Sequence, residues 1–443
     1  MIKIGFVSLG CSKNLVDTEV MLRILHDKGY ELTPDESEAE VIVINTCGFI
    51  ESAKRESIDN IIELASLKEN GKCKYIIAAG CLVERYREEV MQELPEVDAL
   101  IGVGSIHNIA DAVEALYRGE KYISFEDKMT CKLGGDRILT TDEHTAYLKI
   151  AEGCDNRCSY CAIPLIRGGL RSRSVEDIVK EAVDLEALGV KEINLIAQDT
   201  TRYGLDLYGE LSLAKLVKEI CKKTSIPWIR LLYCYPDKIT DELIAELRDN
   251  PRLLKYMDIP IQHISDKVLR LMNRHGDGAL IRETVKKLRA EVPGIVLRTT
   301  AMVGFPGESE EDFTELCEFV KEAKFEHFGA FTYSGEEGTA AYSITDGIVD
   351  EQTKQDRYDI LMQTQLTVVE DLNEREIGRE IEVLCDGYDT VAEIYYGRSY
   401  KDAPDVDGRV YFKSKKRVRP GQFVTVKITE ALDYDLVGEA IRY

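Results

Sequence analysis

The chain has 443 residues, a hydrophobic fraction of 44% and a formal net charge of −23. This length favours about two to four domains, and the negative charge argues against general binding of RNA, whose phosphates are bound mainly through Lys and Arg. We find no secretory leader and no apolar run of the roughly 18–20 residues that span a bilayer, so we expect a cytoplasmic protein that does not bind membranes.

The first 118 residues alternate between strand and helix patterns. Short apolar strands are predicted at 2–7, 41–44, 75–79 and 99–103, and helices at 14–28, 50–68, 83–93 and 107–117. Such alternation predicts a parallel, doubly wound α/β sheet. The charged and aperiodic residues 119–145 that follow are interpreted as a linker.

The alternation resumes at residue 146. Six strands are expected at 146–151, 192–197, 229–233, 256–260, 296–304 and 327–333, and helices at 174–188, 213–223, 241–249, 281–290 and 310–323. Six strand–helix units predict a TIM-like but incomplete (βα)6 barrel. A long helix at 351–375 ends this second domain, which we place at 146–376.

The tail, residues 377–443, changes in character. Its short strand patterns lie at 379–385, 390–396, 408–412, 423–430 and 436–442, with almost no helix between them. Five short strands in so few residues predict a small, OB-like β-barrel.

Three cysteines stand close together in Cys-Asp-Asn-Arg-Cys-Ser-Tyr-Cys, where Cys154, Cys158 and Cys161 follow the first strand of the expected barrel. Active sites of barrel enzymes lie at the carboxyl ends of the strands. Cubane iron–sulfur clusters usually take four cysteines, so three thiolates leave one iron open for the amino and carboxylate groups of S-adenosylmethionine. A zinc site is the alternative, but zinc motifs usually add a second Cys-x-x-Cys pair or two histidines, and neither is nearby.

A second set of cysteines is scattered along the sequence. Cys11, Cys47 and Cys81 each lie just past the end of a predicted parallel strand, and the carboxyl ends of such strands share one crevice. A glycine beside each cysteine lets the backbone approach a bulky group. We interpret the set as ligands of a second cluster. The alternative is three small, buried cysteines, which is how we interpret the remaining six.

Polar residues at other strand ends are candidates for cofactor binding. Gln198 and Asp199 follow the second barrel strand and suit the ammonium group of S-adenosylmethionine, while Arg298 in the fifth strand suits its carboxylate. Gln262 and His263 are also candidates for contact with substrate or cofactor. Each of these residues has an ordinary structural alternative.

The cysteine motif at 154–161 resembles the radical S-adenosylmethionine motif, and with the second cysteine set and the small barrel the whole chain resembles the methylthiotransferases. The resemblance implies an amino-terminal cluster domain over 1–118, a radical core over 146–376 and a TRAM domain over 377–443. It also implies two 4Fe-4S clusters. One cleaves S-adenosylmethionine, and the other, on Cys11, Cys47 and Cys81, presents the sulfur.

Residues 8–17 are similar to the segment of the RimO type, which modifies a ribosomal protein. Residues 260–263, 333–334 and 336–339 also resemble this type. Members of the MiaB type, which modify tRNA, usually have Gly-Cys-Gln-Met-Asn at the first cysteine. The resemblance implies methylthiolation of the β-carbon of an aspartate in small-subunit ribosomal protein twelve. The alternative is a tRNA methylthiotransferase that acts on the modified adenosine next to the anticodon.

The charge of the tail bears on this choice of substrate. The tail has 11 Lys or Arg and 12 Asp or Glu, so it suits a basic ribosomal protein better than tRNA. The basic run at 413–419 is one departure, for which contact with RNA is the alternative, but such a run is more often a solvated loop. The resemblance further implies an electron donor such as a flavodoxin or a ferredoxin, and contact with nucleic acid only through the ribosome.

Overall fold

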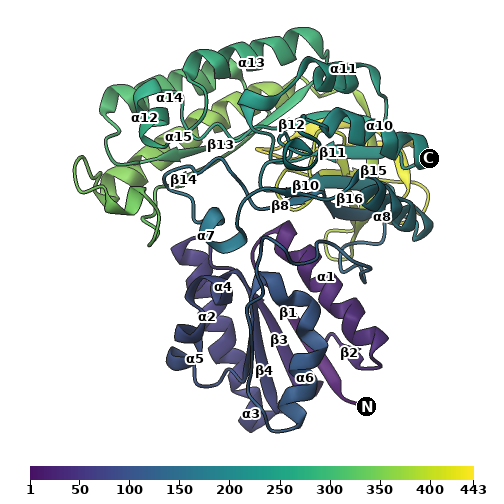
Figure 1. The fold of residues 1–443 in the computed structure, drawn as a ribbon. Helices are drawn as coiled ribbons and strands as arrows, with labels where there is room; N and C mark the ends of the chain where they lie inside the picture. The colour runs from purple at the N-terminus through teal and green to yellow at the C-terminus, as the bar shows by residue number, and fades with distance from the viewer.

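Six parallel strands form the amino-terminal sheet in the computed structural model, which describes all 443 residues (Figure 1). Their order is β2-β1-β3-β4-β5-β6. All six residues of β3 are buried, as expected for a central parallel strand that helices cover on both faces. The strands are β1 Lys3–Ser8, β2 Glu31–Thr33, β3 Val41–Thr46, β4 Tyr75–Gly80, β5 Ala99–Ile101 and β6 Tyr122–Ser124.

Some elements of this domain differ from the prediction. The helix expected at 83–93 is two helices, because Arg87 between them has a φ of 49°, and the first of them begins at Cys81. The edge strands β2 and β6 were missed because three residues are too few to show alternation, and β6 lies in the predicted linker. The helices are α1 Ser12–Asp27, α2 Glu51–Ala65, α3 Leu67–Asn70, α4 Cys81–Tyr86, α5 Glu88–Glu93 and α6 Ile109–Tyr117.

The second domain is an open barrel of six parallel strands, as predicted. The strand order is β14-β13-β12-β11-β10-β7, and the edge strands β7 and β14 do not pair with each other. All six expected strands are present: β7 Thr145–Lys149, β10 Glu192–Ile196, β11 Trp228–Leu231, β12 Leu253–Asp258, β13 Val296–Val303 and β14 His327–Thr332.

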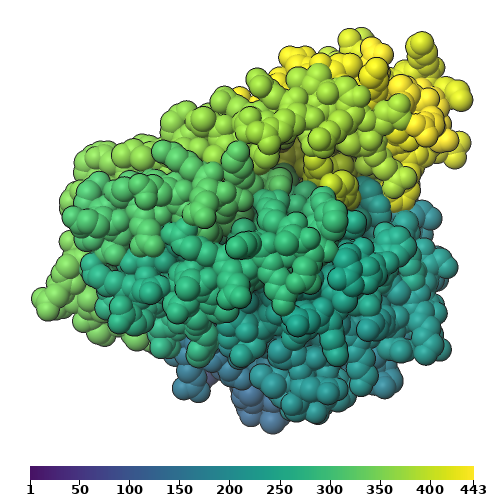
Figure 2. Space-filling view, turned by 90° about the horizontal axis from the view of Figure 1, so that it is seen from above, coloured from purple at the N-terminus to yellow at the C-terminus, as the bar shows by residue number.

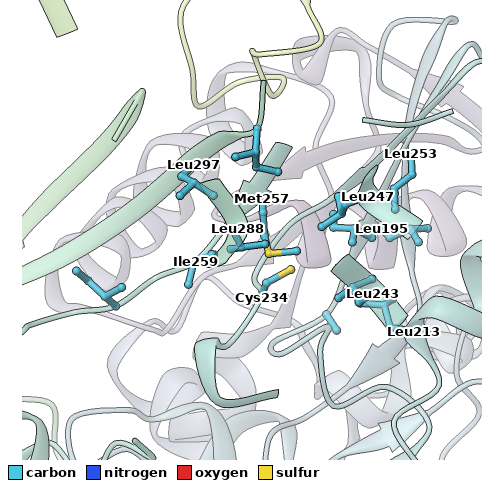
Figure 3. Packing of buried hydrophobic residues seen from close by; sticks show 14 of the residues in the cluster. Leu195, Leu213, Cys234, Leu243, Leu247, Leu253, Met257, Ile259, Leu288 and Leu297 are labelled. Atoms are coloured by element: carbon cyan, nitrogen blue, oxygen red, sulfur yellow. The ribbon is translucent and has the colours of Figure 1, made fainter. Parts of the chain in front are cut away.

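Helices cover the outer face of these strands. Figure 3 shows the packing, in which Leu195 and Met257 from the sheet meet Leu243 and Leu288 from the helices. The long helices are α8 Val175–Ala187, α10 Leu213–Lys223, α11 Asp241–Asp249, α13 Gly278–Glu291, α14 Glu310–Ala323 and α15 Glu351–Glu374. The sequence did not indicate the short elements, which are the β8 Ala151–Glu152 and β9 Arg171–Ser172 hairpin, α7 Ile163–Arg167, α9 Leu205–Tyr208 and α12 Asp266–Leu271. No helix of the chain has both the length and the apolar character needed to cross a bilayer.

The tail is a closed five-stranded barrel, which confirms the predicted fold class. Its order is β15-β16-β17-β19-β18. Figure 2 shows these carboxyl-terminal residues, in yellow, along one side of the core. The strands are β15 Glu380–Asp389, β16 Ile394–Ser399, β17 Val410–Lys413, β18 Phe423–Ala431 and β19 Leu436–Arg442.

Side chains of the tail dock against the inner side of the open barrel. Tyr147 donates to Asp405 at 2.8 Å, and Tyr256 donates to Asp407 at 2.7 Å. The ring of Trp228 packs edge-on against Phe423, with 5.0 Å between the ring centroids. The tail therefore covers apolar surface that an open barrel alone would expose.

Candidate functional site

The three amino-terminal cysteines meet at the carboxyl edge of the first sheet. Cys11 precedes α1, Cys47 follows β3 and Cys81 begins α4 after β4, and the three strands β1, β3 and β4 are neighbours. A methyl group placed on Gly10 would lie 2.9 Å from the Cys47 sulfur, and one on Gly48 would lie 2.9 Å from the backbone carbonyl carbon of Cys81. The three loops thus pass so close together that glycine is needed beside the cysteines.

A buried arginine faces this set. Arg167, the last residue of α7, donates from Nη2 to the sulfur of Cys81 at 3.4 Å. Burial raises the pKa of the Cys81 thiol to about 12, and the negative charges of Cys11 and Cys47 act in the same direction. Cys11 reaches solvent, although the protein around its thiol partly desolvates it and opposes ionisation. The charges of Lys13 and Arg167 outweigh this effect and hold the pKa of Cys11 below the usual value. Metal binding at this set therefore has to release protons, most easily from Cys11.

The second set, Cys154, Cys158 and Cys161, lies in the loop between β8 and α7. Backbone hydrogen bonds fix this loop, from Cys154 to Gly168 at 3.1 Å and from Cys161 to Cys158 at 3.0 Å. Burial raises the pKa of Cys154 and of Cys161 to about 12 each. Cluster assembly here likewise has to displace thiol protons.

Two residues that the sequence did not single out lie beside Cys158. The hydroxyl of Tyr235 is 3.7 Å from the Cys158 sulfur, and Arg274 Nη1 is 4.0 Å from it. Arg274 also donates to the hydroxyl of Tyr160 at 3.0 Å and to the carbonyl of Pro260 at 2.6 Å. No spacing links Tyr235 or Arg274 to the cysteine motif, so only the folded chain could reveal them.

The geometry of both sets favours a cluster over a single zinc ion. Thiolates bind zinc at about 2.3 Å, which keeps their sulfurs within about 4 Å of one another. In neither set do all three sulfurs lie within 4.8 Å of one another. A cubane spreads its thiolates over separate iron atoms and accommodates the wider spacing.

Gln198 and Asp199 lie beside the loop of the second cysteine set. Asn156 of that loop donates to Asp199 at 2.8 Å, and Gln198 donates to Glu152 at 2.6 Å. The side-chain carbonyl oxygens of Gln198 and Asn156 are buried and accept no hydrogen bond from the protein. Burial raises the pKa of Asp199, and hydrogen bonds from Thr201 and Asn156 offset part of that rise. Two free acceptors here fit a ligand that carries an ammonium group.

Two of the other candidate residues, Arg298 and His263, already contact other groups of the protein. Arg298 lies 3.0 Å from Asp258 and 3.2 Å from Asp407 of the tail, so the structure gives it a role in seating the tail barrel. His263 is fully buried, and its Nδ1 accepts from the backbone N–H of Ser265 at 3.0 Å. Neither residue is brought to Gln198 and Asp199 by a direct contact. Gln262 has a φ of 69° and a buried side-chain oxygen without a partner.

A chain of buried polar side chains crosses the domain interface from Cys81 to Gln198. Arg167 donates to Asp17 at 3.0 Å and to Glu152 at 2.9 Å, and Lys149 pairs with the same two carboxylates. Glu152 in turn accepts from Gln198. In Figure 1, α7 lies between the amino-terminal sheet and the barrel. Arg167 therefore connects the Cys81 sulfur to Glu152 and, through Glu152, to Gln198, a candidate for binding S-adenosylmethionine.

Comparison with known proteins assigns the three parts of the chain. Residues 3–102 match the Uncharacterized protein family UPF0004, residues 148–320 the Radical SAM superfamily and residues 377–441 the TRAM domain. A ribosomal protein uS12 methylthiotransferase RimO of Thermoanaerobacter sp. is 50% identical over 440 residues, which cover 99% of this chain and 100% of the relative. The chain belongs to the RimO family. A second RimO, of Acetivibrio thermocellus, is 49% identical over 99% of this chain and 98% of its own length.

Solved structures share the fold at low identity. The radical S-adenosylmethionine methyltransferase TsrM from Kitasatospora setae is 14% identical with a TM-score of 0.56, over 74% of this chain and 72% of that one. The cobalamin-dependent radical enzyme OxsB is also 14% identical, with a TM-score of 0.51 over 84% of this chain and 56% of its own. As a RimO family member with a radical core, the chain is a radical S-adenosylmethionine methylthiotransferase. Such a core implies a 4Fe-4S cluster and S-adenosylmethionine.

Proposed function

We propose that this enzyme acts in the cytoplasm and inserts a methylthio group at the β-carbon of an aspartate in ribosomal protein uS12. The observation that carries the proposal is the placement of two three-cysteine sets on either side of one domain interface, across which buried Arg167 contacts both Cys81 and Glu152. The RimO relatives that match over the full length of the chain carry the uS12 substrate in their names, which supports the same choice.

We assign Cys154, Cys158 and Cys161 to the radical cluster, and Gln198 and Asp199 to S-adenosylmethionine. The bound cluster and cofactor supply a radical that removes hydrogen from an unactivated carbon, which side-chain acids and bases cannot do. The protein positions the cofactor. The side-chain oxygen of Gln198, which accepts no hydrogen bond from the protein, is an acceptor for the ammonium group of S-adenosylmethionine. A flavodoxin or a ferredoxin is the kind of electron donor that this assignment requires.

We assign a second 4Fe-4S cluster to Cys11, Cys47 and Cys81, as the place from which sulfur is delivered. Three cysteines again leave one coordination position open, and Arg167 donates a hydrogen bond to one ligand sulfur. Hydrogen bonds of this kind tune a cluster without occupying its open position. In this proposal residues 1–118 handle sulfur, residues 146–376 generate the radical, and residues 377–443 form the TRAM domain.

The substrate is tested by a competition. The enzyme is reconstituted without oxygen and supplied with reductant, sulfide and S-adenosylmethionine, and it is offered uS12 and unmodified tRNA together. We expect the methylthio mass gain on uS12 alone, at an aspartate that peptide mapping then identifies. A gain on the tRNA would replace the proposed substrate while leaving the radical chemistry in place.

The division between the two clusters is tested by Cys81→Ala. We expect bound iron to fall by about four atoms per chain, cleavage of S-adenosylmethionine to continue, and sulfur insertion into uS12 to be lost, because one cluster has lost a ligand. Iron content and the two products are measured on the same samples. Cys317→Ala, on the outer helix α14, is the matched control and should behave like the parent. Normal sulfur insertion by Cys81→Ala would contradict the assignment.

A further inference from the structure

Lys13 is a largely buried residue whose ammonium group pairs with no carboxylate of the chain. Its side chain belongs to a residue that is only 7% exposed, and its ammonium group makes no hydrogen bond or ion pair with the protein. The ammonium nitrogen stands 3.2 Å from the centroid of the Tyr233 ring. A cation–π contact returns only part of the hydration that an ammonium loses on burial, so the Lys13 ammonium is free to pair with the carboxylate of a bound ligand.

Most other buried cations of this chain are paired with carboxylates. Lys149 and Arg167 share Asp17 and Glu152, and the remaining buried lysines and arginines pair with carboxylates too, apart from Arg274. Arg274 donates hydrogen bonds to a hydroxyl and a carbonyl instead. Lys13 is thus the exception, and Asp17, four residues further along α1, is already paired with Lys149 and Arg167.

The position of Lys13 lies between the two cysteine sets. It follows Cys11 by two residues, in the first turn of α1. Tyr233, under its ammonium group, lies in the loop after β11, and the hydroxyl of Tyr235 in the same loop is 3.7 Å from the Cys158 sulfur. Cys11 is itself exposed, so solvent and ligands reach this side of the interface.

We infer that Lys13 binds the side-chain carboxylate of the substrate aspartate, an inference that rests on the proposed function. The carboxylate is bonded directly to the β-carbon that has to lie between the sulfur-delivering cluster and the radical cofactor. A cation that holds this carboxylate must therefore stand between the two cysteine sets, as Lys13 does. The free acceptors that suit the ammonium group of S-adenosylmethionine belong to other side chains, Gln198 and Asn156.

Binding without turnover tests this inference. Cluster-loaded enzyme with S-adenosylmethionine and no reductant is titrated into labelled uS12, and into uS12 whose target aspartate is replaced by asparagine, and Kd is read by fluorescence anisotropy. We expect the parent enzyme to prefer the aspartate protein by about tenfold or more, the usual size of a charge-assisted hydrogen bond. Lys13→Met should bind both proteins equally, through weaker binding of the aspartate form. Lys28→Met, at the exposed end of α1, should retain the preference.

Each contrary outcome has a distinct meaning. A preference that survives in Lys13→Met overturns the assignment of Lys13. A matching loss of affinity for S-adenosylmethionine, measured by equilibrium dialysis, would show that the ammonium holds the cofactor, and this also overturns the inference. If the parent enzyme binds neither form of uS12, the proposed substrate is wrong and the inference falls with it. Iron content and circular dichroism of Lys13→Met establish that the variant is folded and loaded.

Discussion

The buried side chain of Arg167 contacts one sulfur and two carboxylates. Its guanidinium contacts the Cys81 sulfur at 3.4 Å, Asp17 at 3.0 Å and Glu152 at 2.9 Å. Arg167→Met leaves two buried carboxylates with Lys149 as their remaining cation, and breaking such a buried network costs about 3–5 kcal/mol. We expect urea unfolding of the cluster-free chain to show this loss, whereas Arg118→Met at the surface should change little. An Arg167→Met chain of unchanged stability would contradict the role of the network.

Some residues of the site can be predicted from the sequence around them, and others cannot. The six cysteines were predicted because each follows an apolar strand or lies in a compact motif, and the structure gathers them into two sets of three. That these cysteines bind iron–sulfur clusters remains a proposal. Arg167, Tyr235 and Arg274 were missed because distant segments bring them to the sulfurs. Lys13 lies in the segment 8–17 that resembles the RimO type, but its burial without a carboxylate partner is a property of the folded chain.

Elements were predictable where their boundaries have local chemical causes. Helix α14 begins where expected because Ser309 caps it and Asp312 completes a capping box, a pattern that sequence alone displays. The break between α4 and α5 depends on the left-handed backbone of Arg87, which nothing in its neighbourhood indicates. Helix α7 has only five residues, too few for a helical period, yet it carries Arg167. The short, irregular pieces thus position much of the site.

At the scale of the whole molecule, the tail and the radical core share a buried ionic seam. Arg398 of the tail pairs with Glu192 and Asp386, and Arg230 of the core pairs with the same Glu192 at 3.0 Å. The sequence predicted both domains but not this seam, because its partners come from strands about two hundred residues apart along the chain. We therefore expect the tail and the core to unfold as one unit.

Trp228, the single tryptophan of the chain, reports on that seam because it packs against Phe423 of the tail. In the parent protein, its fluorescence change should coincide with the loss of helical circular dichroism in urea, as a two-state transition requires. Arg398→Met leaves the Glu192 and Asp386 carboxylates with fewer cations, so the fluorescence change should then occur at lower urea than the loss of helix. Arg442→Met, in an exposed pair on the tail, should leave the two transitions together. Separate transitions in the parent protein would mean that the tail detaches as an independent domain, and that the seam does not couple it to the core.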